Sequence, residues 1–320
     1  MRYEKIGNSH INSSKIILGT WQAGKTMWAD IDDNETIKAI RGALDVGITT
    51  IDTAIRYGDG HSEKIISKAL KSVAREEYYI ATKVFSDKLK YDQVLEECHT
   101  SLTNLQTDYI DLYQIHWPSG SFGSTVVPIA ETMEALNFLK GTGKILNIGV
   151  SNFSKDQIEE ALQYGEIVSN QPPYSLIWRA YDKTTNPFCR NHNIAILAYS
   201  SLAQGILTGK FKAGHVFKAG DHRVHNKLLQ PKNFANVTIV LEKLQRYADK
   251  YSTSLGNIAL NWLISKPNTF AIVGARNLAQ ITENSKCCDF ILSTEDLIAI
   301  DKLSDIVTSN MVQDNVMWDE

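Results

Sequence analysis

The stretch Thr50-Ile51-Asp52-Thr53-Ala54-Ile55-Arg56-Tyr57-Gly58 joins a β-branched run to two side chains that can exchange protons. The run ends in an aspartate, and a tyrosine follows in the next loop, before a glycine-rich turn. In enzymes built on parallel barrels, the catalytic side chains lie at the carboxyl ends of strands and in the loops after them. The stretch therefore predicts a strand that ends in an acid and a loop that presents a phenol for proton transfer.

Two later apolar runs also end in a polar residue. Lys83 follows the run Tyr79-Ile80-Ala81-Thr82, and His116 follows Asp111-Leu112-Tyr113-Gln114-Ile115. Each residue alone is compatible with a structural role, such as a strand-end lysine or a core histidine. The occurrence of such residues at three successive strand ends favours one shared site.

The chemistry of these four residues assigns each a role. The phenol of Tyr57 is the proton donor, although its ordinary pKa near 10 makes it a poor acid–base group at neutral pH. The ammonium of Lys83 is expected to lower that pKa. A buried ammonium needs a carboxylate, which Asp52 supplies, and His116 is expected to orient the substrate oxygen.

The rest of the chain alternates between short apolar runs and amphipathic segments, which is typical of parallel strands connected by helices. Strands are expected at residues 15–18, 49–53, 78–84, 110–116, 145–150, 167–170, 194–199 and 270–273. Helices are expected at residues 35–44, 62–71, 91–105, 130–140, 154–164, 183–192, 237–251, 255–265 and 278–287. Eight such units favour a closed (β/α)₈ TIM barrel over an open sheet, although the pattern alone does not exclude the latter. We expect one domain over residues 1–320, with an N-terminal hairpin within 2–14 and an extra C-terminal helix at 294–303. The irregular stretch 209–236 is long enough to be a functional lid.

Composition and charge narrow the classes of partner. The chain has 320 residues, 43% apolar and 22% charged, and a net charge of −3. This balance gives no electrostatic basis for binding nucleic acid or an anionic membrane. The sequence has no apolar run long enough to span a bilayer and no apolar signal segment, so a cytoplasmic protein is expected.

Cysteine and histidine spacing predicts no metal site. The four cysteines contain no CxxC pair, and the neighbours Cys287 and Cys288 are of a kind that rarely bridges, so reduced buried thiols are expected. His222 and His225 lack further ligands. The sequence also lacks a complete GxGxxG motif, which disfavours a Rossmann domain.

The motifs Asp52-Thr53-Ala54 with Tyr57-Gly58, Ala81-Thr82-Lys83 and Gln114-Ile115-His116-Trp117 resemble the catalytic tetrad of the aldo-keto reductases. The resemblance extends from about Leu18 to Leu303, and it is greatest for the bacterial general-aldehyde and potassium-channel β-subunit-like branches. It implies a single barrel that binds NADP(H) and reduces aldehydes or ketones to alcohols. It also implies a small-molecule carbonyl substrate and a monomer or weak homo-oligomer.

The same resemblance assigns cofactor-binding residues to the carboxyl ends of several strands. It implies polar residues that hold the nicotinamide carboxamide, an aromatic side chain (Tyr199) against the nicotinamide ring and a loop that binds the pyrophosphate. It also implies a 2′-phosphate site at a helix start, because Arg276 opens a helix. The implied contacts are Gly19, Thr20, Trp21, Asp52, Ser151, Asn152, Gln171, Tyr199, Ser200, Leu202, Gln204, Gly205, Lys210, Gly274, Arg276, Gln280 and Asn284. An arginine at the 2′-phosphate position implies a preference for NADPH over NADH.

The substrate pocket is expected to be aromatic, although each tryptophan in it is equally compatible with a packing role. Its predicted residues are Trp21, Tyr57, His116, Trp117 and Trp178. Two other functions stay open. One is a cofactor-binding regulatory subunit resembling potassium-channel β subunits, which the complete tetrad and the lack of an added N-terminal segment disfavour. The other is a barrel isomerase or lyase that binds no NADPH.

Overall fold

A computed structural model describes residues 1–319 and shows a closed barrel of eight parallel strands in the order β10-β3-β4-β5-β6-β7-β8-β9. This confirms the predicted (β/α)₈ architecture. The strands are β3 (Ile16–Gly19), β4 (Thr50–Asp52), β5 (Tyr79–Val84), β6 (Leu112–Ile115), β7 (Ile148–Ser151), β8 (Ser169–Gln171), β9 (Ala195–Ala198) and β10 (Thr269–Gly274).

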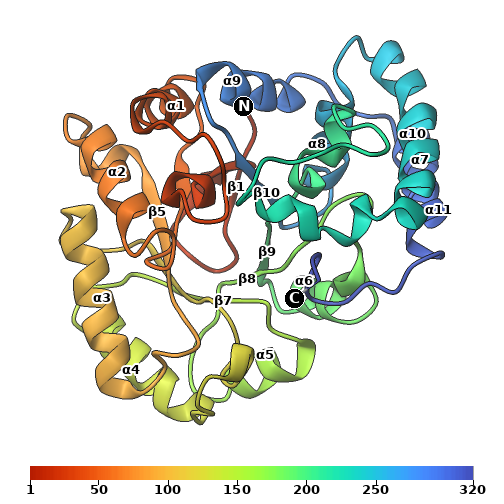
Figure 1. Cartoon of the computed structure of the whole chain (residues 1–320). Coiled ribbons are helices and arrows are strands. Elements are labelled where there is room, and N and C mark those ends of the chain that lie inside the picture. Colours follow the sequence, from red (N-terminus) through yellow and green to blue (C-terminus); the bar gives the residue numbers. More distant parts are fainter. Residues whose placement is uncertain (320) are drawn as a thin grey trace.

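Helices form an outer ring around the strands (Figure 1). They are α1 (Asp33–Asp45), α2 (His61–Leu70), α3 (Tyr91–Leu105), α4 (Ile129–Gly141), α5 (Lys155–Ala161), α6 (Thr185–Asn191), α7 (Pro231–Lys250), α8 (Leu255–Ile264) and α9 (Leu278–Ser285). Side-chain caps begin several of them, and Ser154 and Gln157 form a capping box at α5. Helix α7 begins six residues before the predicted start at 237, because Pro231 occupies its first turn, where a proline costs no hydrogen bond.

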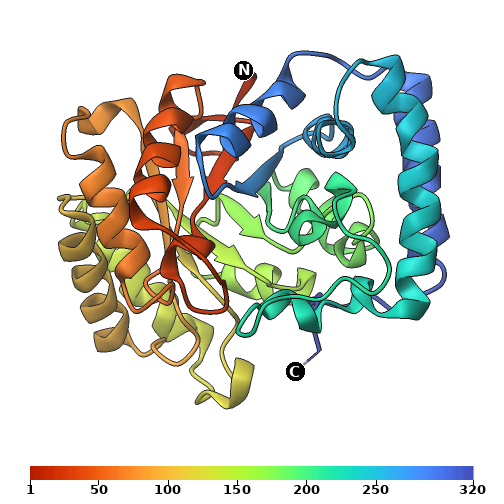
Figure 2. The same cartoon turned by 45° about the horizontal axis from the view of Figure 1, so that its top comes forward.

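The C-terminal segment adds two helices outside the barrel. Helix α10 (Thr294–Leu303) has its predicted bounds, and α11 (Asp305–Thr308) was not predicted because four residues carry too little periodicity. Both pack along α7 (Figure 2).

The predicted N-terminal hairpin is present as β1 (Tyr3–Lys5) paired with β2 (Asn12–Ser14). Between these strands lie Ile6 and Ile11, which have 0% and 1% exposure. They belong to the same apolar cluster as Ile17, Leu112 and Phe270, on three barrel strands. The hairpin therefore closes one end of the barrel with an apolar plug.

The two-residue repeat of a strand determines what lines the barrel. On β6, Leu112 lies in the apolar interior cluster, and Gln114 reaches Asp52 of β4 with its side chain. On β5, Ala81 is in that cluster and Lys83 reaches Asp52. The barrel is thus apolar at the hairpin end and polar at the carboxyl ends of the strands.

Gln114 fits inside the barrel because β7 carries a glycine beside it. A Cβ atom at Gly149 would lie 2.5 Å from Ser169 Oγ and 3.0 Å from Gln114 Cγ. Either distance is too short for a carbon contact without movement, so the missing side chain makes room for the polar layer.

The long stretch after β9 is compact. It contains 3₁₀ turns at His222–His225 and Lys227–Leu229, and the C-terminal tail pairs with it. Lys227 N donates to the Met317 carbonyl at 2.9 Å, and Asp319 N donates to the His225 carbonyl at 3.0 Å. Within residues 1–319, no helix combines the length and the apolar character that crossing a bilayer requires.

Candidate active site

Asp52, Lys83, Tyr57 and His116 meet at the carboxyl ends of β4, β5 and β6, as predicted. Lys83 has 0% exposure, and its Nζ atom lies 2.7 Å from Asp52 Oδ1 and 2.7 Å from the Thr53 carbonyl oxygen. The same Nζ lies 5.2 Å from the ring centroid of Tyr57. The ring of Tyr57 meets the ring of His116 edge-on, with centroids 5.7 Å apart.

The direction of the pKa shift of Tyr57 differs from the expectation. Burial raises its pKa above the ordinary value, and the opposing effect of Lys83 is smaller. The lysine therefore acts in the predicted direction, but desolvation of the phenolate outweighs it. Tyr57 is protonated at neutral pH in this structure and has a proton to donate.

His116 is neutral. Burial, followed by the positive charges of Lys83 and Arg56, holds its pKa well below the ordinary value. Its Nδ1 atom is buried and has no hydrogen-bond partner in the described chain. A neutral imidazole with a free ring nitrogen can hydrogen-bond a carbonyl oxygen.

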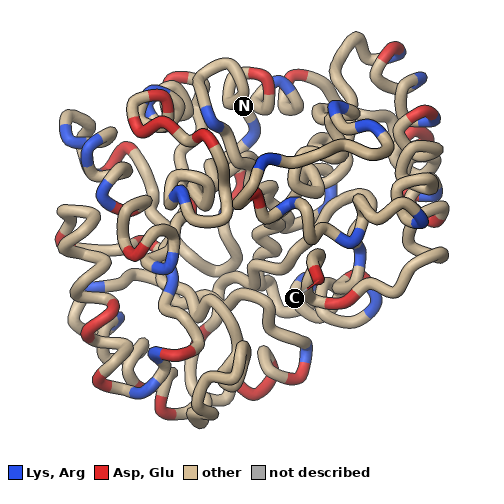
Figure 3. The backbone as a smooth tube through the Cα atoms, viewed as in Figure 1, with Lys and Arg blue, Asp and Glu red and all other residues tan. Residues whose placement is uncertain are grey.

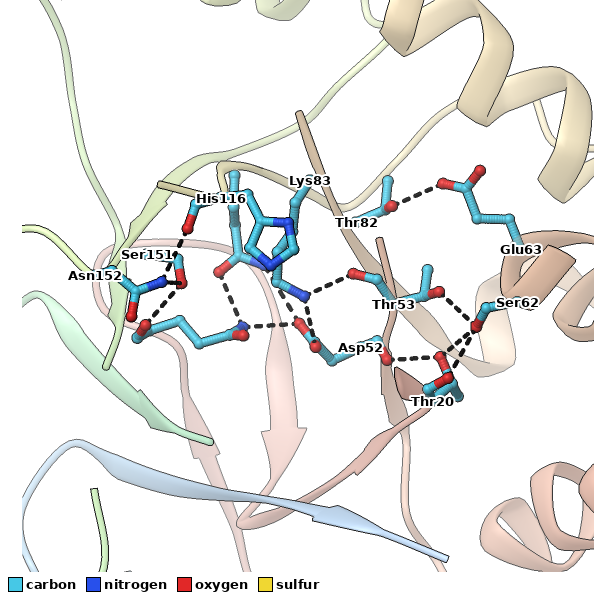
Figure 4. Close-up of polar contacts among 12 residues, drawn as sticks. Thr20, Asp52, Thr53, Ser62, Glu63, Thr82, Lys83, His116, Ser151 and Asn152 are labelled. Atoms are coloured by element: carbon cyan, nitrogen blue, oxygen red, sulfur yellow. Dashed lines mark hydrogen bonds and ion pairs between the residues drawn. The ribbon is translucent and has the colours of Figure 1, made fainter. Parts of the chain in front are cut away.

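The start of α2 connects the ends of β3, β4 and β5, and the last two of these strands carry Asp52 and Lys83 (Figure 4). Ser62 Oγ lies 2.8 Å from Thr20 Oγ1 and 2.9 Å from Thr53 Oγ1. The buried Glu63 accepts a hydrogen bond from Thr82 Oγ1 at 2.7 Å, beside Lys83 in the chain. These bonds fix three strand ends relative to one another. Neither Ser62 nor Glu63 was predicted as part of the site.

A second polar group lies beside the tetrad, at the ends of β7, β8 and β9. Ser151 Oγ donates to the Gln171 carbonyl at 2.7 Å, and Asn152 Oδ1 accepts from the Tyr199 hydroxyl at 2.9 Å. Gln171 Nε2 donates to Asp52 Oδ2 at 2.8 Å, which links this group to the tetrad. Gln114, which was not predicted, lies 3.4 Å from the same oxygen. Its position two residues before His116 in the predicted strand 110–116 was the available signal.

The loop after β9 has an unusual backbone. Ser200, Ala203, Gln204 and Gly205 all have positive φ, between 49° and 95°. Such a run in non-glycine residues is costly and is characteristic of ligand-binding sites. A Cβ atom at Gly205 would lie 2.8 Å from Lys210 Nζ, so the glycine lets the ammonium approach the loop.

Three cations gather beside this loop. The pKa of Arg276 is lowered by burial and then by the charge of Arg223, and that of Lys210 by burial and then by Arg223 and Arg276. Arg223 Nε is paired with Asp221 Oδ1 at 2.8 Å. Arg276 Nη2 is buried without a partner among residues 1–319. The three positive charges repel one another, and the guanidinium of Arg276 has no partner within the described residues. Both features favour the binding of an anionic ligand here.

The remaining predicted contacts lie around these cations or at the neighbouring strand ends. Gln280 Oε1 accepts from the Arg276 backbone N–H at 2.8 Å, and Asn284 Nδ2 lies 3.4 Å from the Gly274 carbonyl oxygen. Gly274 is the register partner of Gly19 on the next strand. Sequence reasoning missed Arg223, because no motif marks its loop.

Aromatic side chains flank the tetrad on two sides. The Trp21 ring lies 6.5 Å from that of Tyr57, 5.8 Å from that of His222 and 6.3 Å from that of Trp318 in the tail. On the opposite side, the ring of Phe85 meets the ring of His116 edge-on at 5.4 Å. Trp117 is 7% exposed and meets Phe122 edge-on at 5.0 Å. The contribution of the C-terminal tail was not predicted.

Trp178 does not belong to this pocket, so the prediction for it was wrong. Its side chain has 0% exposure and lies in the main hydrophobic core. Its indole N–H donates to the Asp314 carbonyl oxygen at 3.1 Å. The tryptophan thus stabilises the docked tail from beneath and presents no surface to a ligand.

Lysine and arginine residues are interspersed with acidic residues over the outer helices (Figure 3). This mixed pattern agrees with the net charge of −3.

Comparison with known proteins gives a consistent result. The model of the Aldo/keto reductase family matches residues 15–305. The aldo-keto reductase YhdN of Bacillus subtilis is 38% identical, covering 92% of this chain and 91% of its own. The NADH-specific methylglyoxal reductase of Escherichia coli is 35% identical, covering 92% and 96%. A probable voltage-gated potassium channel subunit beta of Arabidopsis thaliana is 30% identical, covering 97% of each chain.

Solved structures give the same result. The glycerol dehydrogenase AKR11B4 of Gluconobacter oxydans superposes with a TM-score of 0.87 at 31% identity, covering 98% of both chains. An aldo/keto reductase of Klebsiella pneumoniae in complex with NADP and acetate superposes with a TM-score of 0.74 at 28% identity, covering 96% and 95%.

Proposed function

Because this chain belongs to the aldo/keto reductase family, we propose that it reduces aldehydes or ketones to alcohols with NADPH, and that Tyr57 donates the proton. The observation that carries this proposal is the fully buried Lys83, held by Asp52 and directed at the Tyr57 ring. A buried ammonium between a carboxylate and a phenol has little structural value, because its desolvation is costly. It is well suited to stabilising a phenolate.

The bound cofactor supplies the hydride. The residues of the chain manage the proton and the developing charge on oxygen. Neutral His116 hydrogen-bonds the carbonyl oxygen and orients it toward Tyr57, whose raised pKa keeps the phenol protonated. After the proton leaves, Lys83 stabilises the phenolate, and Asp52 keeps Lys83 charged.

The cofactor would lie across the polar strand ends. Ser151, Asn152 and Gln171 offer the donors and acceptors that a carboxamide needs, and Tyr199 offers an aromatic face beside them. The loop at 200–205, with Lys210, suits the pyrophosphate. Leu202 has negative φ and Ala203 has positive φ, and successive residues of opposite φ sign direct their backbone amides toward an anion.

The preference for NADPH over NADH rests on the unpaired guanidinium of Arg276. A 2′-phosphate would give Nη2 the partner it lacks within the described residues and would relieve the repulsion among Arg276, Arg223 and Lys210. The methylglyoxal reductase relative is NADH-specific by name, whereas the aldo/keto reductase of Klebsiella pneumoniae was solved with NADP, so these similar proteins are named with different cofactors.

The substrate is a small carbonyl compound. Trp21 and Phe85 form apolar walls of the pocket, and Tyr57 and His116 supply its polar groups. Such a pocket holds an apolar substituent and directs the carbonyl oxygen at the tetrad.

The test is a steady-state assay of purified protein with NADPH or NADH and a panel of aldehydes and ketones that includes methylglyoxal. We expect oxidation of NADPH with several aldehydes. Tyr57→Phe should reduce kcat by about 10²- to 10⁴-fold, the usual contribution of general acid catalysis, with NADPH affinity unchanged. The matched variant Tyr164→Phe, at a tyrosine on the surface with 44% exposure, should be fully active. An active Tyr57→Phe enzyme would refute the proposal.

A second candidate is a regulatory subunit that binds the cofactor with little turnover, which the 30% identity to a potassium channel subunit beta supports. Tight NADPH binding, negligible oxidation with the whole panel and co-purification of a membrane protein would favour it.

A further inference from the structure

The four cysteines have two different environments. Cys98 and Cys189 are fully buried, and burial raises the pKa of each thiol to about 12. Cys287 and Cys288 are adjacent, and their sulfur atoms are 4.0 Å apart. Cys288 is partly exposed, and its Sγ also lies 3.5 Å from Met1 Sδ. Cys98 and Cys189 are therefore inert, whereas Cys288 is accessible to solvent and has a second thiol beside it.

The surroundings of Cys288 favour its thiolate. A hydrogen bond from the Cys287 thiol lowers the pKa of Cys288 most, and the backbone N–H and the guanidinium of Arg2 lower it further, against the opposing effect of burial. The pKa of Cys287 is raised by burial. Cys288 is thus the nucleophile and Cys287 the thiol that can resolve its oxidised form.

This pair lies at the end of helix α9. A 3₁₀ turn, Lys286–Cys288, follows α9 without a break. The Cys287 carbonyl oxygen accepts from Asn261 Nδ2 at 2.8 Å and from Arg2 Nη2 at 3.3 Å. The same two groups bond the Phe290 carbonyl oxygen, at 2.7 and 3.1 Å. The turn therefore anchors the end of α9 to α8 and to the N-terminal segment.

We propose that Cys287 and Cys288 are a modification site for hydroperoxides, at which a vicinal disulfide forms and releases the end of α9. The Cys288 thiolate attacks the terminal peroxide oxygen, the O–O bond breaks, and the leaving hydroxide (an alkoxide for an organic hydroperoxide) takes up a proton to become water or an alcohol. Cys287 sulfur then attacks the Cys288 sulfenic acid, and the S–O bond breaks. The hydroxide of the sulfenic acid leaves with the Cys287 proton as water. The two thiols lose two electrons, and the peroxide gains them.

The disulfide cannot form within the present turn. Its sulfurs must approach from 4.0 Å to about 2 Å, with the Cβ atoms about 4 Å apart. Because Lys286–Cys288 is a 3₁₀ turn, its backbone must rearrange, and the Cys287 carbonyl loses its alignment with Asn261 and Arg2. The opposite end of α9 carries Gln280, which bonds the Arg276 backbone. We therefore expect oxidation to weaken NADPH binding, an expectation that rests on the proposed cofactor site.

The first experiment treats reduced protein with hydrogen peroxide and counts free thiols after denaturation. We expect the count to fall from four to two and the peptide beginning at Cys287 to lose two hydrogens by mass spectrometry. Cys287→Ser should stop at a sulfenic acid that dimedone traps on Cys288, and Cys288→Ser should react slowly. Cys98→Ser is the matched control and should still form the disulfide. Preferential oxidation of Cys98 or Cys189, or no disulfide at 287–288, would overturn the proposal.

The second experiment measures NADPH affinity by fluorescence before oxidation, after it and after reduction with dithiothreitol. We expect the Kd to rise by about fivefold or more, the lower end of ordinary coupling between two sites, and to return on reduction. The double variant Cys287→Ser/Cys288→Ser should show no change. A disulfide that leaves the Kd unaltered would refute the link to α9. Reduced protein that binds no NADPH would refute the proposed function, while the thiol count would still test the site.

Discussion

Two opposing influences act on the phenol of Tyr57, and their relative size bears on its role. Lys83 favours the phenolate, and burial favours the neutral phenol more strongly. A proton donor in carbonyl reduction must begin the reaction protonated, so the raised pKa agrees with that role. The contribution of Lys83 is then to the charge that remains after transfer.

Arg276 is the residue on which cofactor choice is expected to depend. Arg276→Ala should raise the KM for NADPH by about 10- to 100-fold, the equivalent of about 1.5–3 kcal/mol for a lost hydrogen bond to a charged group. The KM for NADH should change little, since NADH has no 2′-phosphate. Steady-state kinetics with both cofactors measure the effect, with Lys243→Ala, an exposed position on α7, as the control. An equal loss with both cofactors would place the arginine elsewhere on the dinucleotide.

Glu63 should make stability depend on pH. Burial raises the pKa of the Glu63 carboxyl in the folded state. At pH values between the unfolded pKa of about 4.3 and the folded pKa, the carboxyl is therefore ionised in the unfolded chain and protonated in the folded one. Its contribution to stability is complete below the unfolded pKa and is lost as the pH rises through the folded pKa. Glu63→Gln, with an amide that keeps the bond to Thr82, should therefore gain stability relative to the wild type as the pH rises above about 4.

Urea unfolding at several pH values measures this change. Glu63→Ala is the comparison, because it leaves Thr82 and Asn104 unpaired. It should be about 1–3 kcal/mol less stable than Glu63→Gln at every pH, since neither variant has a titrating group at this position. A pH dependence identical in Glu63→Gln and the wild type would contradict the assignment.

At the scale of elements, the C-terminal tail and the 3₁₀ turn His222–His225 act as one unit beside the pocket. The tail pairs with residues 225–227 and places Trp318 against His222, with ring centroids 5.1 Å apart. Trp21 contacts both rings. The pocket wall next to Tyr57 thus depends on two segments that are almost a hundred residues apart in the sequence.

Trp318→Ala should therefore affect substrate binding selectively. We expect the KM for a bulky aromatic aldehyde to rise by about tenfold, or roughly 1.4 kcal/mol of lost apolar contact. The KM for methylglyoxal and the Kd for NADPH should change little. Kinetics with both aldehydes provide the measurement, and Val312→Ala, at an 89% exposed tail position, is the control. A uniform loss of activity would indicate a general disruption of the loop.

At the scale of the whole molecule, the barrel separates stability from chemistry along its axis. The hairpin end is closed by Ile6 and Ile11 within an apolar cluster, and the opposite end carries the polar layer. Glycines sit where chain segments cross closely, and the turn after Tyr57 is one example. Gly58 has φ +67°, and a Cβ atom there would lie 2.3 Å from the Gly24 carbonyl oxygen.

Ile6→Ala should lower stability without altering the chemistry. Removal of this fully buried side chain leaves a cavity in the plug and should cost about 2–5 kcal/mol. Urea unfolding measures the loss of stability. KM values measured at urea concentrations below the unfolding transition should stay unchanged. Ile291→Ala, at a 76% exposed position, should change stability by less than about 0.5 kcal/mol. Equal stability of the two variants would show that the hairpin does not support the barrel.

Local periodicity predicted eight strand–helix units, which favoured a closed barrel, and it placed three polar side chains at strand ends. A strand places alternate side chains on one face, and parallel strands bring their carboxyl ends to one edge, so Asp52, Lys83 and His116 had to converge. Both rules act within a few residues, which is why they can be recognised in one sequence.

Contacts between distant segments required the tertiary structure. Nothing periodic marks Arg223 beside Arg276, Trp318 beside Trp21, or Trp178 in the core beneath the tail. The balance of forces on Tyr57 likewise depends on how deeply the fold buries it. The sequence by itself determined which side chains meet at the strand ends, because short-range geometry aligns those ends. The surroundings of Trp21 and the pKa of Tyr57 were decided by packing between elements far apart in the chain.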